Sequence, residues 1–368
     1  MHIVCSKEDL VNNTNLVLKA ISSRTPLPIL ECILLEVVED KFTMQGNDLS
    51  MAIETNHIEA TIVESGNIAI DAKIFWDIIR KLPENESVVI KVENNQVYIK
   101  GGKAEFKITG QNPEEFPTIP SIEKNEKYQI SAVNLRNMIR QTIFSIATTE
   151  EKPHFTGELI DIDDNSINLV AVDNFRVSLR SLNLDKKVEN IRAIVPGKAL
   201  NELSKILSSN DEATVSIYFA DKHILFETED CIVVSRLLEG EFLKYKQIFN
   251  DEHSTIFYVD RQILLLALER ASLMSTELKK SPVKFKIESD RLEIMSIAEA
   301  GMFNDEIDIE MEGNQLEISF NPRYLIEAIK SIDIDKVSLQ FTTPLSPCTV
   351  KGMDTEDYKY LILPLRIS

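Results

Sequence analysis

Apolar residues recur along this chain at two spacings, one typical of helices and one typical of strands. Residues 70–82 place Phe75, Ile78 and Leu82 at positions i, i+3 and i+7, which is the spacing of an amphipathic helix. Residues 87–109 instead alternate apolar and polar side chains around Asn-Asn and Gly-Gly pairs, which predicts antiparallel hairpins. The same reasoning predicts helices at residues 6–20, 73–82, 132–147, 198–208, 260–278 and 323–331.

The predicted helices belong to a repeated unit. Three segments run from a strand end through a tight turn and a basic residue into a helix, and their basic residues, Lys73, Lys198 and Arg323, are spaced 125 positions apart. Related segments at 112–120 and 239–249 close the first two units. We therefore predict an α+β fold of three repeated domains, each with two helices packed on antiparallel sheets, at residues 1–124, 125–249 and 250–368.

Composition narrows the class of protein. The chain has 368 residues, of which 43% are hydrophobic, so it can bury more than one core. The four cysteines lie far apart and the five histidines have no metal-ligand spacing, which predicts reduced thiols, no metal site and no cofactor. The first residues lack a basic and apolar export signal, and no apolar run reaches the roughly 18 residues that a membrane span needs. We expect a soluble, cytoplasmic protein.

The charge is unevenly distributed. The net charge of −19 argues against an extended nucleic-acid surface, because such surfaces depend on Lys and Arg. The predicted helices, with the residues that directly follow them, nevertheless hold 16 Lys or Arg against 8 Asp or Glu, so they carry +8 and the rest of the chain carries −27. Favourable helix termini and i,i+4 pairs explain part of this excess. They do not explain Arg136 and Arg140, whose helix contains no acid.

The stretch AVDNFRVSLRS (171–181) contains the most conspicuous polar group of residues. Asp173 and Arg176 could form a catalytic pair, but acid–base catalysis normally needs a second acid, a histidine or a metal nearby, and none is evident. Asp48 lies 125 positions earlier and has no arginine in the three residues that follow it. A role in turning the strand end is therefore favoured for both aspartates, and the sequence does not predict an enzyme.

The chain ends in DYKYLILPLRIS (357–368), which is unusually apolar for a terminus. A terminus of this kind is expected to dock as a strand. Burial in a core and exposure in a groove that binds a partner both fit the pattern.

Several fragments together resemble a known family, the bacterial DNA sliding clamps, or DNA polymerase III beta subunits. Each fragment is weak alone, but their order and spacing over the whole chain are specific. They are SRTPLPILECILLEV (23–37), DAKIFWDIIRKLP (71–83), EEFPTIP (114–120), AVDNFRVSL (171–179), IVPGKALNEL (194–203) and YLILPLRI (360–367).

The resemblance implies a closed ring made by a head-to-tail homodimer, with helices facing double-stranded DNA and sheets outside. It implies a processivity factor without catalysis, metal or cofactor. Its expected partners are the replicative DNA polymerase, the clamp loader and repair polymerases, which bind through short linear motifs. A ring holds DNA by topology, so a mildly basic lining on an acidic protein is sufficient.

The resemblance also implies three sets of site residues. The expected DNA-facing residues are Arg24, Lys73, Arg80, Arg136, Arg140, Lys198, Lys205, Arg270, Lys279 and Lys280. The expected peptide pocket between the second and third domains consists of Phe155, Val172, Asn174, Phe175, Arg176, Val177, Leu243, Gln247, Ile248, Leu345, Leu361, Ile362, Leu363, Pro364, Leu365 and Arg366. The expected dimer interface contains Ile78, Phe106, Ile108, Leu273 and Met274.

The chain departs from the family pattern at the pocket. The family commonly has Gly-His-Arg where this chain has Asn174, Phe175 and Arg176, and Phe-Pro-x-Tyr where it has FLKY (242–245). Loop 148–153 differs from relatives that contact DNA there. Two other classes of protein fit the pattern less well. An enzyme would carry a catalytic set in one repeat, and a trimeric clamp of the archaeal and eukaryotic kind would have two repeats.

Overall fold

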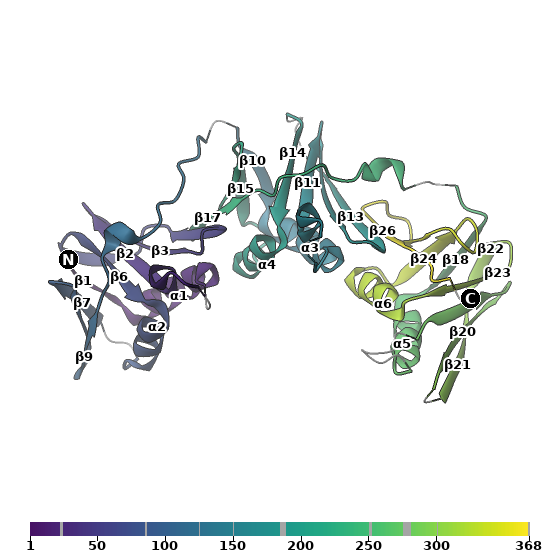
Figure 1. Cartoon of the computed structure of the whole chain (residues 1–368), viewed down its shortest axis with the longest axis horizontal. Coiled ribbons are helices and arrows are strands. Elements are labelled where there is room, and N and C mark those ends of the chain that lie inside the picture. Colours follow the sequence, from purple (N-terminus) through teal and green to yellow (C-terminus); the bar gives the residue numbers. More distant parts are fainter. Residues whose placement is uncertain are drawn as a thin grey trace. The chain divides into compact units, whose positions relative to one another are not determined.

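A computed structural model of the chain describes residues 1–22, 25–84, 87–124, 126–149, 151–184, 189–249, 252–274, 281–299 and 301–366 (Figure 1). Three expected DNA-facing residues, Arg24, Lys279 and Lys280, lie outside these ranges.

The described residues form six α-helices, which begin close to the predicted positions. Where the cap contacts are defined, a polar residue at the strand end accepts a hydrogen bond from the first helical turn, as Ser6, Asp71, Asp260 and Asn321 do. The third and fifth helices end well before the predicted limits. The helices are α1 (Lys7–Val17), α2 (Ala72–Lys81), α3 (Ala132–Thr142), α4 (Gly197–Ile206), α5 (Arg261–Ser272) and α6 (Pro322–Ser331).

Within the part of the chain that the structure describes, the strands form four antiparallel sheets. In spatial order, the five-stranded sheet contains β5 (Ala60–Glu64), β1 (His2–Ser6), β7 (Ser87–Glu93), β8 (Gln96–Gly101) and β9 (Ala104–Thr109). The eight-stranded sheet contains, in the same sense, β10 (Tyr128–Ser131), β15 (Thr214–Phe219), β16 (His223–Glu227), β17 (Cys231–Arg236), β4 (Met51–Thr55), β3 (Lys41–Asn47), β2 (Cys32–Val38) and β6 (Gly66–Asp71).

The other two sheets contain strands of the second and third repeats. In spatial order, the nine-stranded sheet contains β14 (Ile191–Pro196), β11 (Gly157–Asp163), β12 (Ser166–Val172), β13 (Arg176–Asn183), β26 (Tyr358–Ile362), β25 (Cys348–Gly352), β24 (Lys336–Phe341), β18 (Thr255–Asp260) and β22 (Glu310–Gly313). The four-stranded sheet contains β21 (Gly301–Asp308), β20 (Arg291–Ala298), β19 (Val283–Ile287) and β23 (Leu316–Phe320).

The two largest sheets each join strands of two successive repeats. In the eight-stranded sheet β4 pairs with β17, and in the nine-stranded sheet β13 pairs with β26. The chain accordingly divides into two compact units, residues 1–134 with 202–237 and residues 135–201 with 238–368. The second repeat contributes to both units, because its strands complete the sheets of both neighbours. The predicted limits at 124/125 and 249/250 remain a prediction about the repeats of the sequence.

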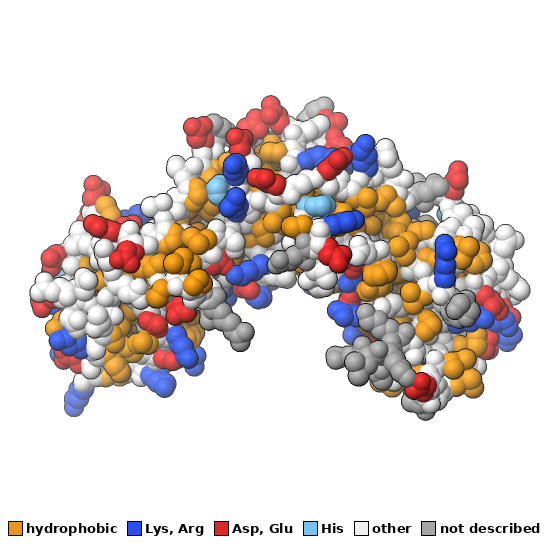
Figure 2. Space-filling model, viewed as in Figure 1, with side chains coloured by type: hydrophobic (Ala, Val, Ile, Leu, Met, Phe, Trp, Pro, Cys, Tyr) orange, Lys and Arg blue, Asp and Glu red, His pale blue; other side chains and the backbone are white. Residues whose placement is uncertain are grey.

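The cores follow from the alternation of side chains along the strands. In β19 the buried residues Val283, Phe285 and Ile287 alternate with half-buried Lys284 and Lys286, so one face of the sheet meets the core. In Figure 1, α5 and α6 lie side by side next to the strands of the third repeat. Acidic side chains gather over the strand ends around β11 and β14 on the face drawn in Figure 2, which agrees with the acidity of the strands and loops.

Candidate functional site

Asp173 forms the turn that leads into β13, as the sequence predicted. Its Oδ1 accepts hydrogen bonds from the backbone N–H groups of Phe175 (2.7 Å) and Arg176 (3.0 Å). Its own N–H donates to the carbonyl of Arg176 (3.1 Å). The carboxylate is therefore committed to the local backbone, which is the usual role of aspartate in such turns.

Arg176 is buried, with 7% of its side chain exposed, and binds several groups at once. Its Nε donates to Asp173 Oδ2 (3.0 Å), and its terminal nitrogens donate to Glu327 of α6 and to the carbonyl of Phe144. The guanidinium also lies over the rings of Tyr324 (4.5 Å) and Phe144 (5.3 Å). Arg176 thus fastens the second repeat to the third, and little of it remains to contact a ligand.

An apolar cluster lies beside this turn and brings together six of the expected pocket residues. Its buried floor includes Val172, Val177 and Leu361, and half-buried side chains pack against that floor. We call this set the groove cluster; it consists of Val172, Val177, Leu361, Phe155, Leu243 and Ile248. Two of its members, Leu243 and Ile248, flank Tyr245, whose hydroxyl donates a hydrogen bond to Asp161 (2.8 Å) and so holds this segment on the sheet.

Exposed side chains continue from the groove cluster along the C-terminal segment. Phe175 is 46% exposed and stacks on Tyr324, with ring centroids 5.9 Å apart and planes 21° apart. The N–H of Leu363 donates to the carbonyl of Phe175 (2.9 Å), and the Leu363 side chain is 39% exposed. Leu345 is 66% exposed and Leu365 is 36% exposed. These side chains form an accessible apolar wall.

The other expected pocket residues differ in accessibility. Ile362 is 1% exposed and packs in the core of the third repeat, because alternate residues of β26 face opposite sides of the sheet. Asn174, Gln247 and Arg366 are exposed, and Pro364 is half-buried. The sequence reasoning missed Phe144, Tyr324 and Glu327 as residues of this site, although it predicted the helix at 323–331 that carries the last two.

The C-terminal strand docks as predicted. Residues 358–362 form β26, which pairs with β13 on one side and with β25 on the other. The sequence left two interpretations open for this segment, burial in a core and exposure at a surface. Each of them holds for a different part of it. Ile362 belongs to a core, whereas Leu363 and Leu365 remain exposed.

The seven expected DNA-facing residues that the structure describes lie on helices α2 to α5, and several carry acidic partners. Arg140 binds Asp333, Arg270 binds Asp305, and Lys205 binds Glu202 (2.7 Å). Arg80 lies over the ring of Trp76 (5.3 Å) on α2, where Lys73 is also exposed. Arg136 and Lys198 also take part in interactions. The positive charge of the helices is therefore partly balanced.

The expected dimer residues lie mainly on accessible elements. Phe106 (38% exposed) and Ile108 are on β9, which ends the five-stranded sheet. Leu273 (76% exposed) and Met274 directly follow α5. Ile78 is only 8% exposed, because it faces the core of the first repeat from α2, so it offers little area to a second chain.

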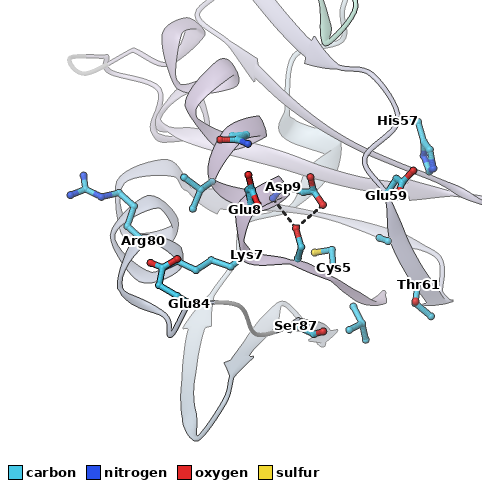
Figure 3. Close-up of a pocket in the computed structure, with 15 residues that line it drawn as sticks. Cys5, Lys7, Glu8, Asp9, His57, Glu59, Thr61, Arg80, Glu84 and Ser87 are labelled. Atoms are coloured by element: carbon cyan, nitrogen blue, oxygen red, sulfur yellow. Dashed lines mark hydrogen bonds and ion pairs between the residues drawn. The ribbon is translucent and has the colours of Figure 1, made fainter.

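A polar pocket of about 1160 Å³ lies in the first repeat; Arg80 lines it, whereas the expected apolar site residues do not (Figure 3). Lys7 points across it toward Glu84 in Figure 3 and donates to Glu84 Oε1 (2.5 Å) and to the carbonyl of Leu82 (2.7 Å). Ser6 both caps α1 and donates to Asp9 (2.6 Å). These polar groups satisfy one another and hold α1 against the end of α2. Among the residues that the structure describes, no group of His, Cys, Asp and Glu side chains could hold a metal ion.

Comparison with known proteins identifies the family. The models of the N-terminal, central and C-terminal domains of the DNA polymerase III beta subunit match residues 1–120, 129–244 and 246–366, in that order. The chain belongs to this family of bacterial sliding clamps. The beta sliding clamp of Staphylococcus epidermidis is 33% identical over 375 residues, which cover 100% of this chain and 99% of the relative.

Solved clamp structures agree with this assignment. The crystal structure of the DNA polymerase sliding clamp from Bacillus subtilis matches with a TM-score of 0.96 and 33% identity, covering 100% of both chains. That of the sliding clamp from Pseudomonas aeruginosa bound to griselimycin matches with a TM-score of 0.95 and 26% identity, again over 100% of both chains. The chain is thus a DNA sliding clamp, a non-catalytic processivity factor of DNA replication. None of the described helices is long and apolar enough to span a membrane.

Proposed function

We propose that two copies of this clamp close head to tail into a ring around duplex DNA, and that partner proteins bind the groove cluster. The observation that carries the proposal of partner binding is the groove cluster, in which half-buried side chains pack against a buried apolar floor. The partners in this proposal are the replicative polymerase, the clamp loader and repair polymerases, in the cytoplasm. The three domains in this proposal are those predicted from the sequence repeats, residues 1–124, 125–249 and 250–368.

The groove cluster has the properties of a peptide site. Its floor is formed by paired strands, β12, β13 and β26, so it is fixed before a ligand arrives. Short linear peptides generally bind such grooves through a few buried apolar anchors. Phe175 and Leu363 extend the apolar surface beyond the floor. We therefore expect a peptide with spaced Leu and Phe side chains to bind here.

The groove is tested by isothermal titration with the synthetic peptide Ser-Leu-Ser-Leu-Phe. Replacing Leu363 by Ala should weaken binding by roughly tenfold, because an exposed anchor contact is lost. The control is Val63→Ala, an exposed aliphatic residue on β5 in the first repeat (61% exposed), which should leave the affinity unchanged. Equal effects of both changes would contradict this placement of the site.

The partial balance of the helical charge suits a ring that slides. Strong phosphate contacts would slow movement along DNA, whereas acidic partners such as Asp333 and Asp305 weaken the attraction. Topological binding predicts that the loaded clamp stays on nicked circular DNA and leaves when that DNA is linearised. Equal retention on circular and linear DNA would mean ordinary surface binding.

The ring joint is proposed at two strands that end their sheets, β9 in the first repeat and β21 in the third. Unpaired edges of this kind are ready to pair with another chain, and a closed ring removes them. Light scattering should give about twice 41.8 kDa for the native protein. Combining Phe106→Ala with Leu273→Ala should shift the mass to that of one chain, whereas Val63→Ala should not. An unchanged dimer in the double variant would refute this joint.

A further inference from the structure

A second apolar hollow lies next to the exposed end of the groove. It has a volume of about 810 Å³ and is bounded by the solvent side of the four-stranded sheet, by the loop at Pro344 and Leu345, and by the C-terminal segment. Along β20, the buried residues Leu292, Ile294 and Ser296 alternate with residues that face outward. The hollow therefore lies on the solvent side of this sheet, opposite its core.

The hollow gathers apolar side chains that are not needed for the core. We call them the sheet patch; it consists of Met295, Ile297, Leu345 and Leu365. Ile297 is 69% exposed and Leu345 is 66% exposed, which leaves a substantial aliphatic surface in water. Exposed apolar residues that gather on one surface generally mark a binding site, whereas scattered ones do not. A methionine in such a patch can adjust its shape to different ligands.

The backbone beside the patch can also bind an extended chain. β23 ends the four-stranded sheet and pairs with β19 on one side. On its other side, the N–H of Leu365 donates to the carbonyl of Ser319 (2.7 Å). The C-terminal segment thus makes one hydrogen bond of the kind that a further strand would make on the edge of β23. Further extended residues could continue along this edge, as in other cases of strand addition.

The patch is continuous with the groove. Leu363 is bonded to Phe175 at the wall of the groove, and Leu365 is bonded to Ser319 beside the patch. Two residues of extended chain span at most about 7 Å, so a peptide that leaves the groove along this segment reaches the patch almost at once. Leu345 and Leu365 belong both to the expected pocket and to the patch.

We propose that the sheet patch binds an extended aliphatic segment that flanks the short motif of a partner protein, so that the groove and the patch together hold one continuous peptide. This inference rests on the proposed function of the groove. The flanking segment carries aliphatic side chains at alternate positions, because alternate residues of a strand face the same surface. We expect the flanking segment also to carry an acidic residue, which would meet the exposed Arg366 at the rim of the hollow. Lys284 at the same hollow is already paired with Glu317 (2.6 Å).

The test compares three synthetic peptides by isothermal titration. The core peptide is Ser-Leu-Ser-Leu-Phe, and the extended peptides add Asp-Leu-Thr-Ile at its N-terminus or at its C-terminus. One of the two extended peptides should bind the native clamp about tenfold more tightly than the core peptide, which corresponds to about 1.4 kcal/mol. Replacing both added aliphatic residues by Ser should remove this gain.

Ile297→Ser locates the added contact. This exposed position lies outside the groove cluster, so the core peptide should bind the variant as it binds the native clamp. The tenfold advantage of the extended peptide should disappear. Val63→Ser, which replaces an aliphatic residue of similar exposure on β5, should keep the advantage.

The outcomes separate the two proposals. If the core peptide binds but neither extension improves its affinity, or if the advantage survives in Ile297→Ser, the sheet patch is not a binding site and the groove proposal stands. If the core peptide itself does not bind the native clamp, the groove proposal fails, and the inference about the patch fails with it.

Discussion

Strands of successive repeats pair at two joints in this chain, β4 with β17 and β13 with β26. The two joints share one turn geometry, but the side chains beside their turns differ in polarity. In the first joint, Asp48 Oδ1 accepts from the N–H groups of Ser50 (3.0 Å) and Met51 (2.8 Å), as Asp173 does with Phe175 and Arg176. The incoming strand is also fixed in the same way. Arg236 N–H donates to the carbonyl of Ser50 (2.9 Å) in the first joint, and Leu363 N–H donates to that of Phe175 in the second.

The two joints differ in the polarity of the side chains beside their turns. The second joint has the cross-strand pairs Val172–Val177 and Val170–Leu179, all four apolar. At the same register, 125 positions earlier, the first joint has Asn47–Ala52 and Gln45–Glu54.

The polar groups of the first joint satisfy one another. Gln45 donates to Glu54 (2.8 Å), whose pKa burial raises, and Asn47 donates to the carbonyl of Pro117 (3.3 Å) and accepts from Leu49 N–H (2.8 Å). Where the second joint exposes Leu363, the first exposes Arg236. The duplicated backbone turn therefore does not duplicate the apolar surface beside it, because the side chains at only a few positions decide its polarity.

The largest expected effect concerns Glu158 of β11, whose equivalent in the first repeat is the fully buried Ile33. Neither carboxyl oxygen of Glu158 has a hydrogen-bond partner among the described residues, and burial raises its pKa to about 8. The nearby Thr142 hydroxyl acts in the opposite direction and lowers this pKa, while its own proton is donated to the carbonyl of Met138 (2.8 Å). Folding therefore retains a proton that the unfolded chain releases above about pH 4.5.

The free energy of unfolding should fall as the pH rises from about 4.5 to about 8 and should lose up to about 5 kcal/mol from this group. Glu158→Gln should remove this contribution. Denaturant midpoints at pH 5 and pH 8 measure the difference, and other titrating groups cancel between the native protein and the variant. Parallel pH dependences of the two proteins would show that Glu158 is not protonated in the folded state.

Exchanging one residue between the joints tests the groove more directly. Val172→Asn places the residue of the first joint into the groove cluster, where its amide would be buried under a bound peptide without a partner. We expect peptide affinity to fall by roughly a hundredfold, because an unsatisfied buried amide costs about 1–3 kcal/mol and an anchor contact is lost as well. The reverse change, Asn47→Val, should not alter the affinity measured by titration. A loss of less than threefold for Val172→Asn would argue against the cluster as the site.

The C-terminal segment provides a smaller change. The first joint continues into the chain between the second and third repeats, whereas the second is followed by residues 363–366, the last that the structure describes. Residues 364–368 are therefore the segment to delete. Deleting these residues should weaken the core peptide by about thirtyfold, or about 2 kcal/mol, because the anchors lose one side of their pocket. Far-UV circular dichroism should be unchanged, since β26 ends at Ile362. Retention of full affinity would mean that the segment does not contact the peptide.

The smallest expected effects come from replacing the aspartates of the two turns. Asp48→Ala should lower the free energy of unfolding by about 1 kcal/mol, as expected for lost turn hydrogen bonds, without changing peptide affinity. Asp173→Ala removes the same kind of bonds and also a partner of Arg176, so it should weaken the peptide by a few fold. If Asp48→Ala weakens peptide binding as much as Asp173→Ala does, the two joints do not differ in function.

The sequence predicted the elements of this fold better than their connections. The helices, the 125-residue repeat and the turn role of Asp173 follow from local periodicity and from the chemistry of aspartate. The pairing of β4 with β17 and of β13 with β26 did not follow, because strand pairing between distant segments leaves no local pattern. The bonds from Arg176 to Phe144 and Glu327 were missed for the same reason, since these residues meet only after the repeats have joined.

The pairing of β4 with β17 also has a consequence during synthesis of the chain. Cys231 pairs with Thr55, which precedes it by 176 positions. At translation rates of about 5–20 residues per second, the free edge of β4 waits about 10–35 s for its partner strand to leave the ribosome. Pairings this distant also fold slowly, and an open edge can pair with a neighbouring chain in the meantime. Nascent clamps should therefore depend on chaperones most strongly before residue 236 has emerged.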